Sequence, residues 1–401
     1  MTSGHLSISV ASSLAAVDAA DWDACACSTV ESVSEGAESD SQHDRDNPFI
    51  RHAFLLALEE SGSAVGRTGW SGAHLLVKDA AGSLLACAPA YLKTHSQGEY
   101  VFDHSWADAY QRAGGAYYPK VQVSVPFTPA TGRRLLVRPG PRAQEARDGL
   151  VAGLRALRRE ADASSVHVTF LPRGEWEALG AAGFLQRTDQ QFHWLNEGYG
   201  SYDDFLGALS SRKRKALKKE RREAVAPGIE IEQLTGADIT EAHWDAFFRF
   251  YMDTGSRKWG RPYLTRVFFS LVGERMADRV LLVMAKREGR YIAGAINFIG
   301  ADALYGRNWG CIEQHPYLHF EVCYHQAIDF AIARRLARVE AGAQGEHKLA
   351  RGYRPVTTYS AHDIADPGLR RAVAEYLERE RMHVEAINGE LKEMAPFRKG
   401  S

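Results

Sequence analysis

The sequence predicts a two-domain α/β protein in which each domain is a sheet flanked by helices. The chain has 401 residues, whereas a single hydrophobic core stops growing efficiently at about 250–300 residues. Both halves also show one order of elements: helices, an antiparallel meander, a helix and two further strands. We therefore expect a structural duplication with a boundary near Asn196–Ser201.

The first domain, expected over residues 1–198, is predicted from turn signals and apolar periodicity. Residues 28–46 are rich in Ser, Glu, Asp and Gly without periodicity, which predicts a mobile loop. Asn47 and Pro48 then open a helix that runs to about Glu60. The remaining predictions are strands at 6–10, 74–78, 84–92, 117–127, 166–171 and 191–195, and helices at 18–25, 143–161 and 175–179.

The second domain, expected over residues 199–401, opens with a helix at 202–226 that Pro227-Gly228 ends. Its basic portion spans 210–226. Asp366-Pro367 opens a long C-terminal helix that reaches about Met394. The remaining predictions are strands at 229–234, 280–287, 291–299, 303–309, 338–341 and 356–362, and helices at 242–253, 265–276 and 320–335.

Composition excludes several classes of function. The formal net charge is -1, so no net electrostatic field draws the chain to nucleic acid or to a membrane. The hydrophobic share of 45% is ordinary for a globular protein. No apolar run approaches the ~18–20 residues that cross a bilayer, and the N-terminus lacks the basic region of a signal peptide. The five cysteines are typical of reduced thiols. We expect a cytoplasmic protein without a membrane span.

A strongly basic stretch between Ser211 and Arg222 interrupts this neutral background. Glu220 and Glu223 are the only acids close enough to neutralise it within one helix. Such a helix suits a polyanion, and its affinity would fall with salt as counterions are released. A solvated face is the alternative. The candidate ligands of donor phosphates are Arg212, Lys213, Arg214 and Lys215.

Three segments resemble the FemAB-like branch of the GNAT acyltransferase superfamily. The basic helix is one. In the second, residues 339–352, Lys348 and Gly352 keep the family's Lys-x-x-x-Gly spacing, while Glu340 replaces an Asp and His347 replaces an aromatic residue. The third, residues 94–106, is similar to a signature of a subgroup labelled peptidoglycan biosynthesis or recognition proteins.

The resemblance implies two tandem GNAT-like domains, each with a mixed, mostly antiparallel sheet, and transfer of an acyl or aminoacyl group to an amine. FemAB-like enzymes use aminoacyl-tRNA and other GNAT relatives use acyl-coenzyme A, so either is an expected co-substrate, with no tightly bound cofactor. The amine would belong to a peptidoglycan precursor, a peptide or a small molecule. A non-catalytic RNA-binding or recognition module is the alternative from another class.

Lys348 and Glu340 are the catalytic candidates. Transfer from an ester or thioester passes through a tetrahedral oxyanion, which a fixed cation such as Lys348 would stabilise. Lys348 could also hold a donor phosphate. Glu340, at the end of a strand, could take the proton of the attacking ammonium. Gln344 and His347 are assigned to the donor site in the same loop. The structural alternative is an exposed Lys and an ion-paired Glu.

Strand alternation predicts that Tyr305, Arg307 and Trp309 point to one side. In GNAT folds this strand diverges from the next and opens the donor site. The resemblance therefore implies Arg307 as an anion ligand and Trp309 as a stacking wall. We also assign Tyr305 and Trp309 to the acceptor. Core aromatic residues with a surface Arg are the alternative.

Polar and aromatic side chains crowd residues 100–118, outside any periodic element. This density suits a binding loop for a polar acceptor, although a well-bonded interdomain loop would look the same. The acceptor candidates are Asp103, His104, Trp106, Tyr118 and Lys120.

Two further motifs are interpreted as coincidences. Residues 111–116 match the pyrophosphate loop of acetyltransferases, but that loop must open a helix and a strand is expected here. The missing loop weakens the coenzyme A hypothesis. Cys311, His315, His319 and Cys323 are evenly spaced, yet on a helix they would spread along the axis, so we expect no metal site.

Overall fold

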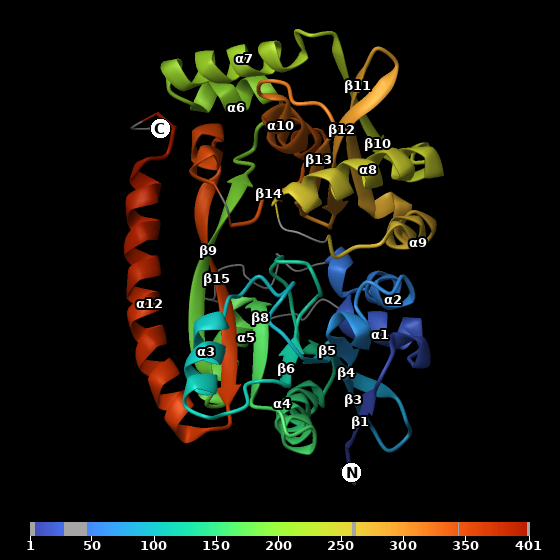
Figure 1. The fold of residues 1–401 in the computed structure, drawn as a ribbon, viewed down its shortest axis with the longest axis vertical. Coiled ribbons are helices and arrows are strands. Elements are labelled where there is room, and N and C mark those ends of the chain that lie inside the picture. Colours follow the sequence, from blue (N-terminus) through green and yellow to red (C-terminus); the bar gives the residue numbers. More distant parts are fainter. Residues whose placement is uncertain (1–4, 28–45, 259–261, 344, 399–401) are drawn as a thin grey trace. The chain divides into compact units, whose positions relative to one another are not determined.

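The computed structural model describes residues 5–27, 46–258, 262–343 and 345–398 (Figure 1). Its contacts divide the chain into two compact units, one of residues 1–189 and 358–384, the other of residues 190–357 and 385–401. The single domain boundary that we expect at residue 198 is not tested by this division into units, and it stays a prediction. The predicted mobile loop 28–46 lies outside the described residues, apart from Asp46.

The first unit contains two sheets. The smaller is antiparallel in the order β1 (Ser7–Ala11), β3 (His74–Lys78), β4 (Leu84–Ala88) and β7 (Leu136–Val137). The larger joins β2 (Trp70–Gly72), β5 (Ala90–Lys93), β6 (Lys120–Val123), β8 (Ser165–Leu171) and the later part of β15 (Arg354–Ile364). Only β6 and β8 run parallel.

The α-helices that accompany these sheets include α1 (Ala19–Ala26), α2 (His52–Glu60), α3 (His104–Arg112), α4 (Ala143–Glu160) and α5 (Arg173–Ala181). Short 3₁₀ turns lie at Leu14–Ala16, Pro48–Ile50 and Gly66–Thr68. The apolar residues whose spacing predicted α4 form its buried face, since Leu150, Leu154 and Leu157 belong to the core of this unit.

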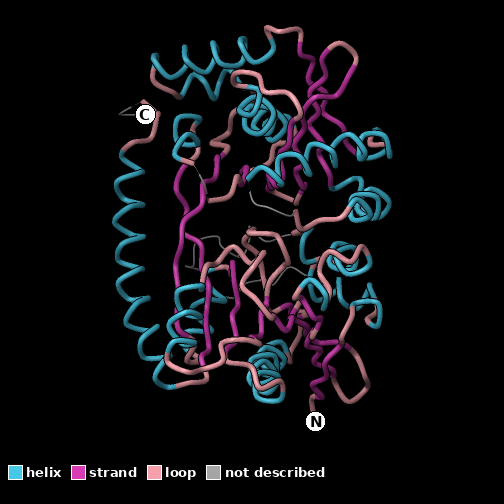
Figure 2. The backbone as a smooth tube through the Cα atoms, in the orientation of Figure 1, coloured by secondary structure: helices cyan, strands magenta, loops and turns pink. Residues whose placement is uncertain are grey.

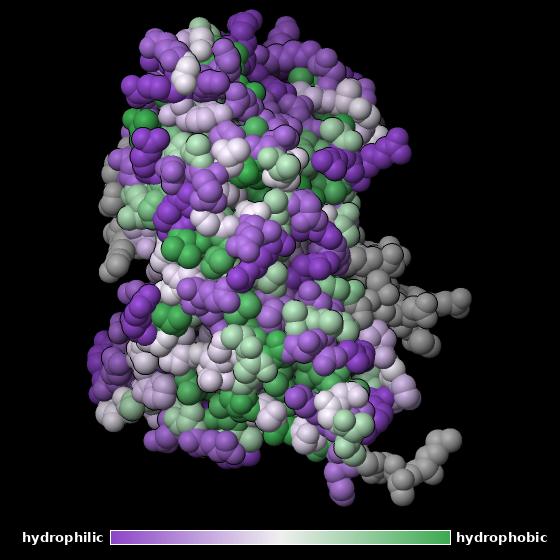
Figure 3. All heavy atoms as spheres, turned by 90° about the vertical axis from the view of Figure 1, so that its right-hand side faces the viewer, coloured by the Kyte–Doolittle hydropathy of each residue, from purple (hydrophilic) through white to green (hydrophobic). Residues whose placement is uncertain are grey.

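The second unit contains one sheet in the order β10 (Ile229–Thr235), β11 (Val280–Arg287), β12 (Arg290–Ile299), β13 (Ala303–Cys311), β14 (Arg338–Glu340) and β9 (Leu185–Leu195). All neighbours are antiparallel except β13 and β14. The surface drawn in Figure 3 intermingles hydrophilic and hydrophobic residues.

Helices cover both faces of this second sheet. They are α6 (Tyr202–Ala208), α7 (Ser211–Val225), α8 (Glu241–Lys258), α9 (Arg266–Met276), α10 (Leu318–Phe320), the π-helical turn η6 (Glu321–His325) and α11 (Gln326–Ala333). Short 3₁₀ turns lie at Gly236–Asp238 and Ala277–Arg279, with η7 at Glu346–Arg351. Helix α8 packs on β12 and β13, and α11 on β13 and β14.

Mixed, mostly antiparallel sheets flanked by helices confirm the predicted fold class. The long C-terminal helix is also confirmed as α12 (Pro367–Glu393), a continuous helix in Figure 2. No helix among the described residues is long and apolar enough to cross a membrane.

Several predicted elements were wrong in extent, and three of them contain predicted site residues. The helix expected over 202–226 is two helices, because Leu209 is extended and forms a β-bridge with Phe397. Residues 100–118 are not an irregular loop but contain α3, which buries little beyond Trp106 and Ala107 and so lacks the apolar stripe of a predicted helix. The strand expected over 117–127 is limited to β6.

Two histidines contact each other in the core of the first unit. His167 in β8 and His362 in β15 are register partners. Their Nδ1 atoms lie 2.7 Å apart, so one imidazole donates to the other. Burial lowers the pKa of His167 to about 3 and lowers that of His362 as well. Both rings are therefore neutral in the folded protein at neutral pH.

We expect this histidine pair to make folding sensitive to acid. Between about pH 6.5 and 3 the unfolded chain binds protons that folded His167 does not, so stability falls as pH drops. His167 alone accounts for roughly 2 kcal/mol of unfolding free energy between about pH 6.5 and 5. Urea unfolding at pH 7.5 and 5 measures this. His167→Gln should reduce the difference, and His104→Gln is the matched change at an exposed histidine. Equal stability at the two pH values would contradict the expectation.

Candidate functional site

The strands β13 and β14 separate after the first three residues of β13. They pair only over Ala303–Tyr305 and Arg338–Glu340, and β13 then continues to Cys311 while β14 ends. A Cβ at Gly306 would lie 3.3 Å from the carbonyl oxygen of Glu340, so the two backbones are still close at the point of separation. Beyond it, β13 has no strand partner on this side within the described residues.

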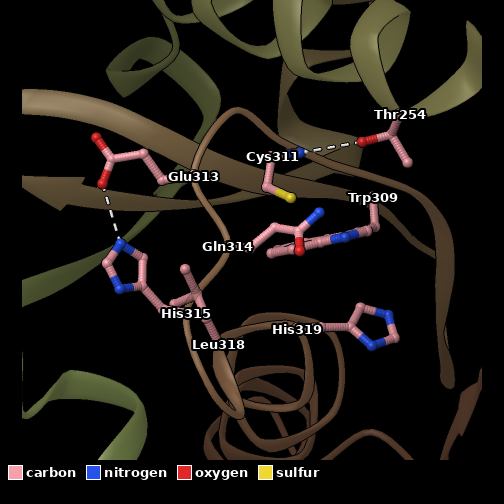
Figure 4. Close-up of a pocket in the computed structure, with 8 residues that line it drawn as sticks. All are labelled: Thr254, Trp309, Cys311, Glu313, Gln314, His315, Leu318 and His319. Carbon is pink, nitrogen blue, oxygen red and sulfur yellow. Dashed lines mark hydrogen bonds and ion pairs between the residues drawn. The ribbon is translucent and has the colours of Figure 1, made fainter. Parts of the chain in front are cut away.

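A cavity of about 300 Å³ lies at the carboxyl end of β13 (Figure 4). This volume is at the lower end of the roughly 300–1,000 Å³ of small-molecule sites. The backbone N–H of Cys311 donates to the hydroxyl of Thr254 at 3.2 Å, which ties α8 to the cavity wall. The lining residues are Thr254, Trp309, Cys311, Glu313, Gln314, His315, Leu318 and His319.

The cavity wall is aromatic and nearly neutral. Figure 4 shows the side chains of Trp309, Gln314 and His319 bordering the same space. The only carboxylate of the lining, Glu313, accepts hydrogen bonds from Arg287 at 3.2 Å and His315 at 3.0 Å. Its charge is therefore already balanced, and the wall suits an uncharged group with a flat or hydrogen-bonding surface.

Aromatic rings connect the cavity to the loop that carries Lys348. The ring of His319 lies 5.2 Å from that of Trp309 and 6.2 Å from that of His347, between centroids. Nε2 of His347 lies 2.9 Å from the hydroxyl of Tyr324. The loop around η7 therefore stands beside the cavity, as the predicted donor role of His347 requires. Gln344 lies outside the described residues.

Lys348 is buried, with 3% of its surface exposed. Its ammonium donates to the carbonyl oxygens of Ala341 at 2.5 Å and Gly342 at 3.0 Å, directly after β14. Burial lowers the pKa of Lys348 to about 8. An ammonium has three donors, so one remains for a ligand. Lys348 thus holds the turn closed and also places a cation where β13 and β14 separate.

Glu340 and His193 form an incompletely bonded pair beside Lys348. Oε1 of Glu340 accepts from Arg338 at 3.0 Å. Oε2 of Glu340 and Nε2 of His193 lie 3.7 Å apart, and neither has a hydrogen-bond partner among the described residues. Burial lowers the pKa of His193, so its ring is neutral and able to accept a proton.

His193 was not predicted as a site residue. It is the register partner of Glu340, which in turn pairs with Tyr305, so the three side chains lie side by side on one face of the sheet. Sequence showed only that 191–195 is a strand. The register that brings His193 to Glu340 joins residues almost 150 positions apart, and no local pattern encodes it.

The prediction that Tyr305, Arg307 and Trp309 share one side was wrong. Tyr305 pairs with Phe298 and Trp309 with Ala295, positions that lie on opposite faces of β12. The cause is a β-bulge between Ile296 and Asn297, which leaves Arg307 as the extra residue of β13. Tyr305 therefore lies with Glu340 and His193, and Trp309 lines the cavity.

The cations of α7 fall into two groups. Arg221 is committed to Glu321 and Asp329, and Lys218 and Lys219 form exposed ion pairs. A second set has no ion pair with any described residue: Arg212, Lys213, Arg214, Lys215 and Arg222. Four of these are the predicted donor-phosphate ligands. Lys213 and Arg214 lie two turns before Glu220 and Arg221, on the same face of the helix.

A buried carboxylate fixes α7 to the Lys348 loop. Glu220 accepts two hydrogen bonds from the guanidinium of Arg351, at 2.8 and 2.6 Å, and lies 2.7 Å from Nε2 of His325. Burial raises its pKa, but the hydrogen bonds from His325 and Arg351 outweigh burial and lower it. The basic helix and the loop of Lys348 therefore meet within the second unit.

Five of the acceptor candidates lie in the first unit, and several of them share a buried network. Lys120 donates to Ser96, Glu99 and Asp103 at 2.6–2.7 Å and has no donor left. Tyr118 bonds to the same Ser96. These bonds favour the structural alternative for Lys120, Asp103 and Tyr118.

The two other acceptor candidates of the first unit lie at different depths. His104 is exposed, and its ring stacks near Phe102, with 6.2 Å between centroids. Trp106 is buried against His362, with 5.0 Å between ring centroids. Their assignment to the acceptor remains a prediction.

The two motifs interpreted as coincidences are also placed. Gly114 and Gly115 follow the end of α3 rather than open a helix. Cys311, His315 and His319 line the cavity, but no three His, Cys, Asp or Glu side chains in the described chain are grouped to hold a metal ion.

The chain belongs to the FemAB-like family, described as peptidoglycan biosynthesis/recognition, whose model matches residues 13–399. A solved structure of FemX is similar at 11% identity and a TM-score of 0.51, covering 84% of this chain and 99% of FemX. A conserved protein of unknown function from Bacteroides thetaiotaomicron VPI-5482 matches at 11% identity and a TM-score of 0.50, covering 90% of this chain and 100% of that one.

A tandem GNAT protein from the clavulanic acid biosynthesis pathway matches at 12% identity and a TM-score of 0.46, covering 90% of this chain and 99% of that one. No curated protein matches the sequence. The tandem GNAT fold expected from the sequence is therefore confirmed by the likeness to FemX, and membership of the FemAB-like family by the family model.

The cavity wall depends on the absence of a side chain at Gly310. A Cβ there would lie 2.2 Å from the carbonyl oxygen of Phe250 in α8. We expect Gly310→Ala to push α8 from β13, to weaken the Thr254–Cys311 bond and to lower the unfolding free energy by about 1–3 kcal/mol. Gly207→Ala is the matched control, since nothing lies within 4 Å of the position that a Cβ would take there. Denaturant unfolding of both variants measures this, and equal stability would contradict it.

Proposed function

We propose that this protein transfers an aminoacyl or acyl group from an activated ester or thioester to an amine. One observation carries the proposal: a buried cation and a carboxylate lie where β13 and β14 separate, and their loop is joined by ring contacts to a neutral cavity at the end of β13. Lys348 binds the carbonyl groups that directly follow Glu340, and the aromatic rings of His347 and His319 lead from this point to the cavity.

The residues supply the parts that such a reaction needs. The amine nitrogen attacks the acyl carbon, a C–N bond forms, and the C–O or C–S bond to the donor breaks. The remaining donor of Lys348 would stabilise the oxyanion of the tetrahedral intermediate. Glu340, with His193 behind it, would take the proton of the attacking ammonium. A proton then passes to the released hydroxyl or thiol, which balances the reaction.

We propose aminoacyl-tRNA as the donor, because five cations of α7 have no ion pair with a described residue and the helix is bonded to the Lys348 loop. Coenzyme A is less well matched, since residues 312–317, between β13 and α10, contain no glycine that would let a backbone cradle pyrophosphate. The family description points to an amine of a peptidoglycan precursor or peptide as the acceptor. Both donors occur in the cytoplasm, which is where we place the reaction.

Transfer assays with aminoacyl-tRNA and with acyl-coenzyme A, each with candidate amines, test the activity. We expect Lys348→Met and Glu340→Gln to lower kcat by roughly 10²–10³-fold. Lys286→Met is the control, because Lys286 binds Glu232 on β10 instead of the turn after β14. Transfer from acyl-coenzyme A but not from aminoacyl-tRNA would identify acyl-coenzyme A as the donor. Full tRNA binding without transfer from either donor would identify a recognition module and reject the enzyme.

The basic helix gives a separate expectation for binding. Replacing Arg212, Lys213, Arg214 and Lys215 by Gln removes up to four phosphate contacts, so the slope of log K against log salt for tRNA becomes shallower by about 3. The control replaces Lys218 and Lys219, which already pair with Asp203 and Glu223. Titrations at several salt concentrations measure both slopes. An equal change in the two variants would contradict a specific role for the first turn of α7.

A further inference from the structure

Arg351 is bonded to three elements at once. Its Nε and one terminal nitrogen donate to Glu220 of α7 at 2.8 and 2.6 Å. Its other terminal nitrogen donates to the carbonyl oxygen of His347 at 2.6 Å, next to Lys348. The guanidinium also lies 3.4 Å from the ring centroid of Phe320 in α10. All three nitrogens of the guanidinium therefore donate a hydrogen bond that holds the loop in place.

The other end of this contact is equally constrained. Glu220 is 9% exposed and Arg351 5%. His325, which bonds to Glu220, lies 2.6 Å from the hydroxyl of Tyr202 in α6. A bidentate guanidinium–carboxylate pair has one preferred geometry, and leaving one partner buried without the other is costly. A displacement of α7 must therefore be followed by the Lys348 loop or break this pair.

The cations available to a polyanion lie on the same helix, close to Glu220. Lys213 and Arg214 are half-buried and lie two turns before Glu220 and Arg221, on the same helix face. A phosphodiester chain that binds Lys213 and Arg214 therefore contacts a helix whose buried face is bonded to Arg351. The backbone N–H of Tyr353 donates to the carbonyl oxygen of Lys348 at 3.2 Å, so this loop also has hydrogen-bonded amides that report its order.

We infer that Arg351 is a positioning residue that couples the binding of a polyanionic donor on α7 to the placement of Lys348 at the site. This inference rests on the proposed function. It adds that donor binding orders the catalytic loop through the Glu220–Arg351 pair, rather than merely raising the local donor concentration.

The chain offers a matched control in Arg221. It follows Glu220 in the same helix and makes a comparable pair, with Glu321 at 2.9 Å and Asp329 at 2.6 Å. Its partners lie in η6 and α11 and not in the Lys348 loop. Arg351→Lys and Arg221→Lys both keep the charge and lose the fork geometry. If Arg351 is purely structural, the two variants should have similar effects on hydrogen exchange and on kcat. If it couples α7 to the Lys348 loop, only Arg351→Lys should change them.

The test is hydrogen–deuterium exchange of the full chain with and without deacylated tRNA at low salt. In the wild type and in Arg221→Lys, we expect tRNA to slow exchange in α7 and at the amides of Lys348, Gly352 and Tyr353. In Arg351→Lys, tRNA should protect α7 only. In the transfer assay, kcat of Arg351→Lys should fall by roughly 10–100-fold while KM for the donor stays within about twofold.

Each other outcome is decisive. Protection of α7 without any change at Lys348–Tyr353 in the wild type overturns the coupling and leaves the proposed function standing. Equal loss of kcat in Arg221→Lys reduces Arg351 to a structural residue. If tRNA does not protect α7, tRNA is not the donor and the coupling is rejected with it. Transfer from acyl-coenzyme A would then test the transferase proposal separately.

Discussion

The arrangement of the second unit depends on one buried carboxylate. Glu220 belongs to a helix whose other charged residues are all cationic except Glu223, yet it is buried and accepts hydrogen bonds from Arg351 and His325. Removing one partner of such a pair typically costs about 3–5 kcal/mol, because the other charge remains buried. The pair therefore fixes where α7 lies relative to the loop after β14. The position of Lys348 beside the cavity follows from it.

The sheet supplies the second constraint. Parallel pairing of β13 with β14 over three residues brings Tyr305 next to Glu340, and antiparallel pairing with β9 adds His193. The early end of β14 then leaves the remainder of β13 to border the cavity. A short parallel ladder thus brings Tyr305, Glu340 and His193 together from three separate segments of the chain.

Sequence reasoning predicted the elements better than it predicted their contacts. Local signals found α4 from its apolar spacing, the meander β11–β13 from its strands and turns, and α12 from Asp366-Pro367 at its start. The basic helix and the Lys348 loop were also found, the latter through its spacing. His193 was missed and Tyr305 and Trp309 were wrongly grouped, since both errors concern register, which a bulge of one residue changes. The break at Leu209 depends on a partner near the C-terminus and is equally invisible in local sequence.

The discontinuous first unit has a consequence for biosynthesis. Its strand β8 pairs with residues 359–364 of β15, which are made after all of residues 190–357. At about 5–20 residues per second, roughly 10–40 s separate the emergence of residue 189 from that of residue 384. During that interval one edge of β8 waits on the ribosome without its partner, while most of the second unit is already available to fold. The first unit is therefore completed only after residues 190–357 of the second unit have been made.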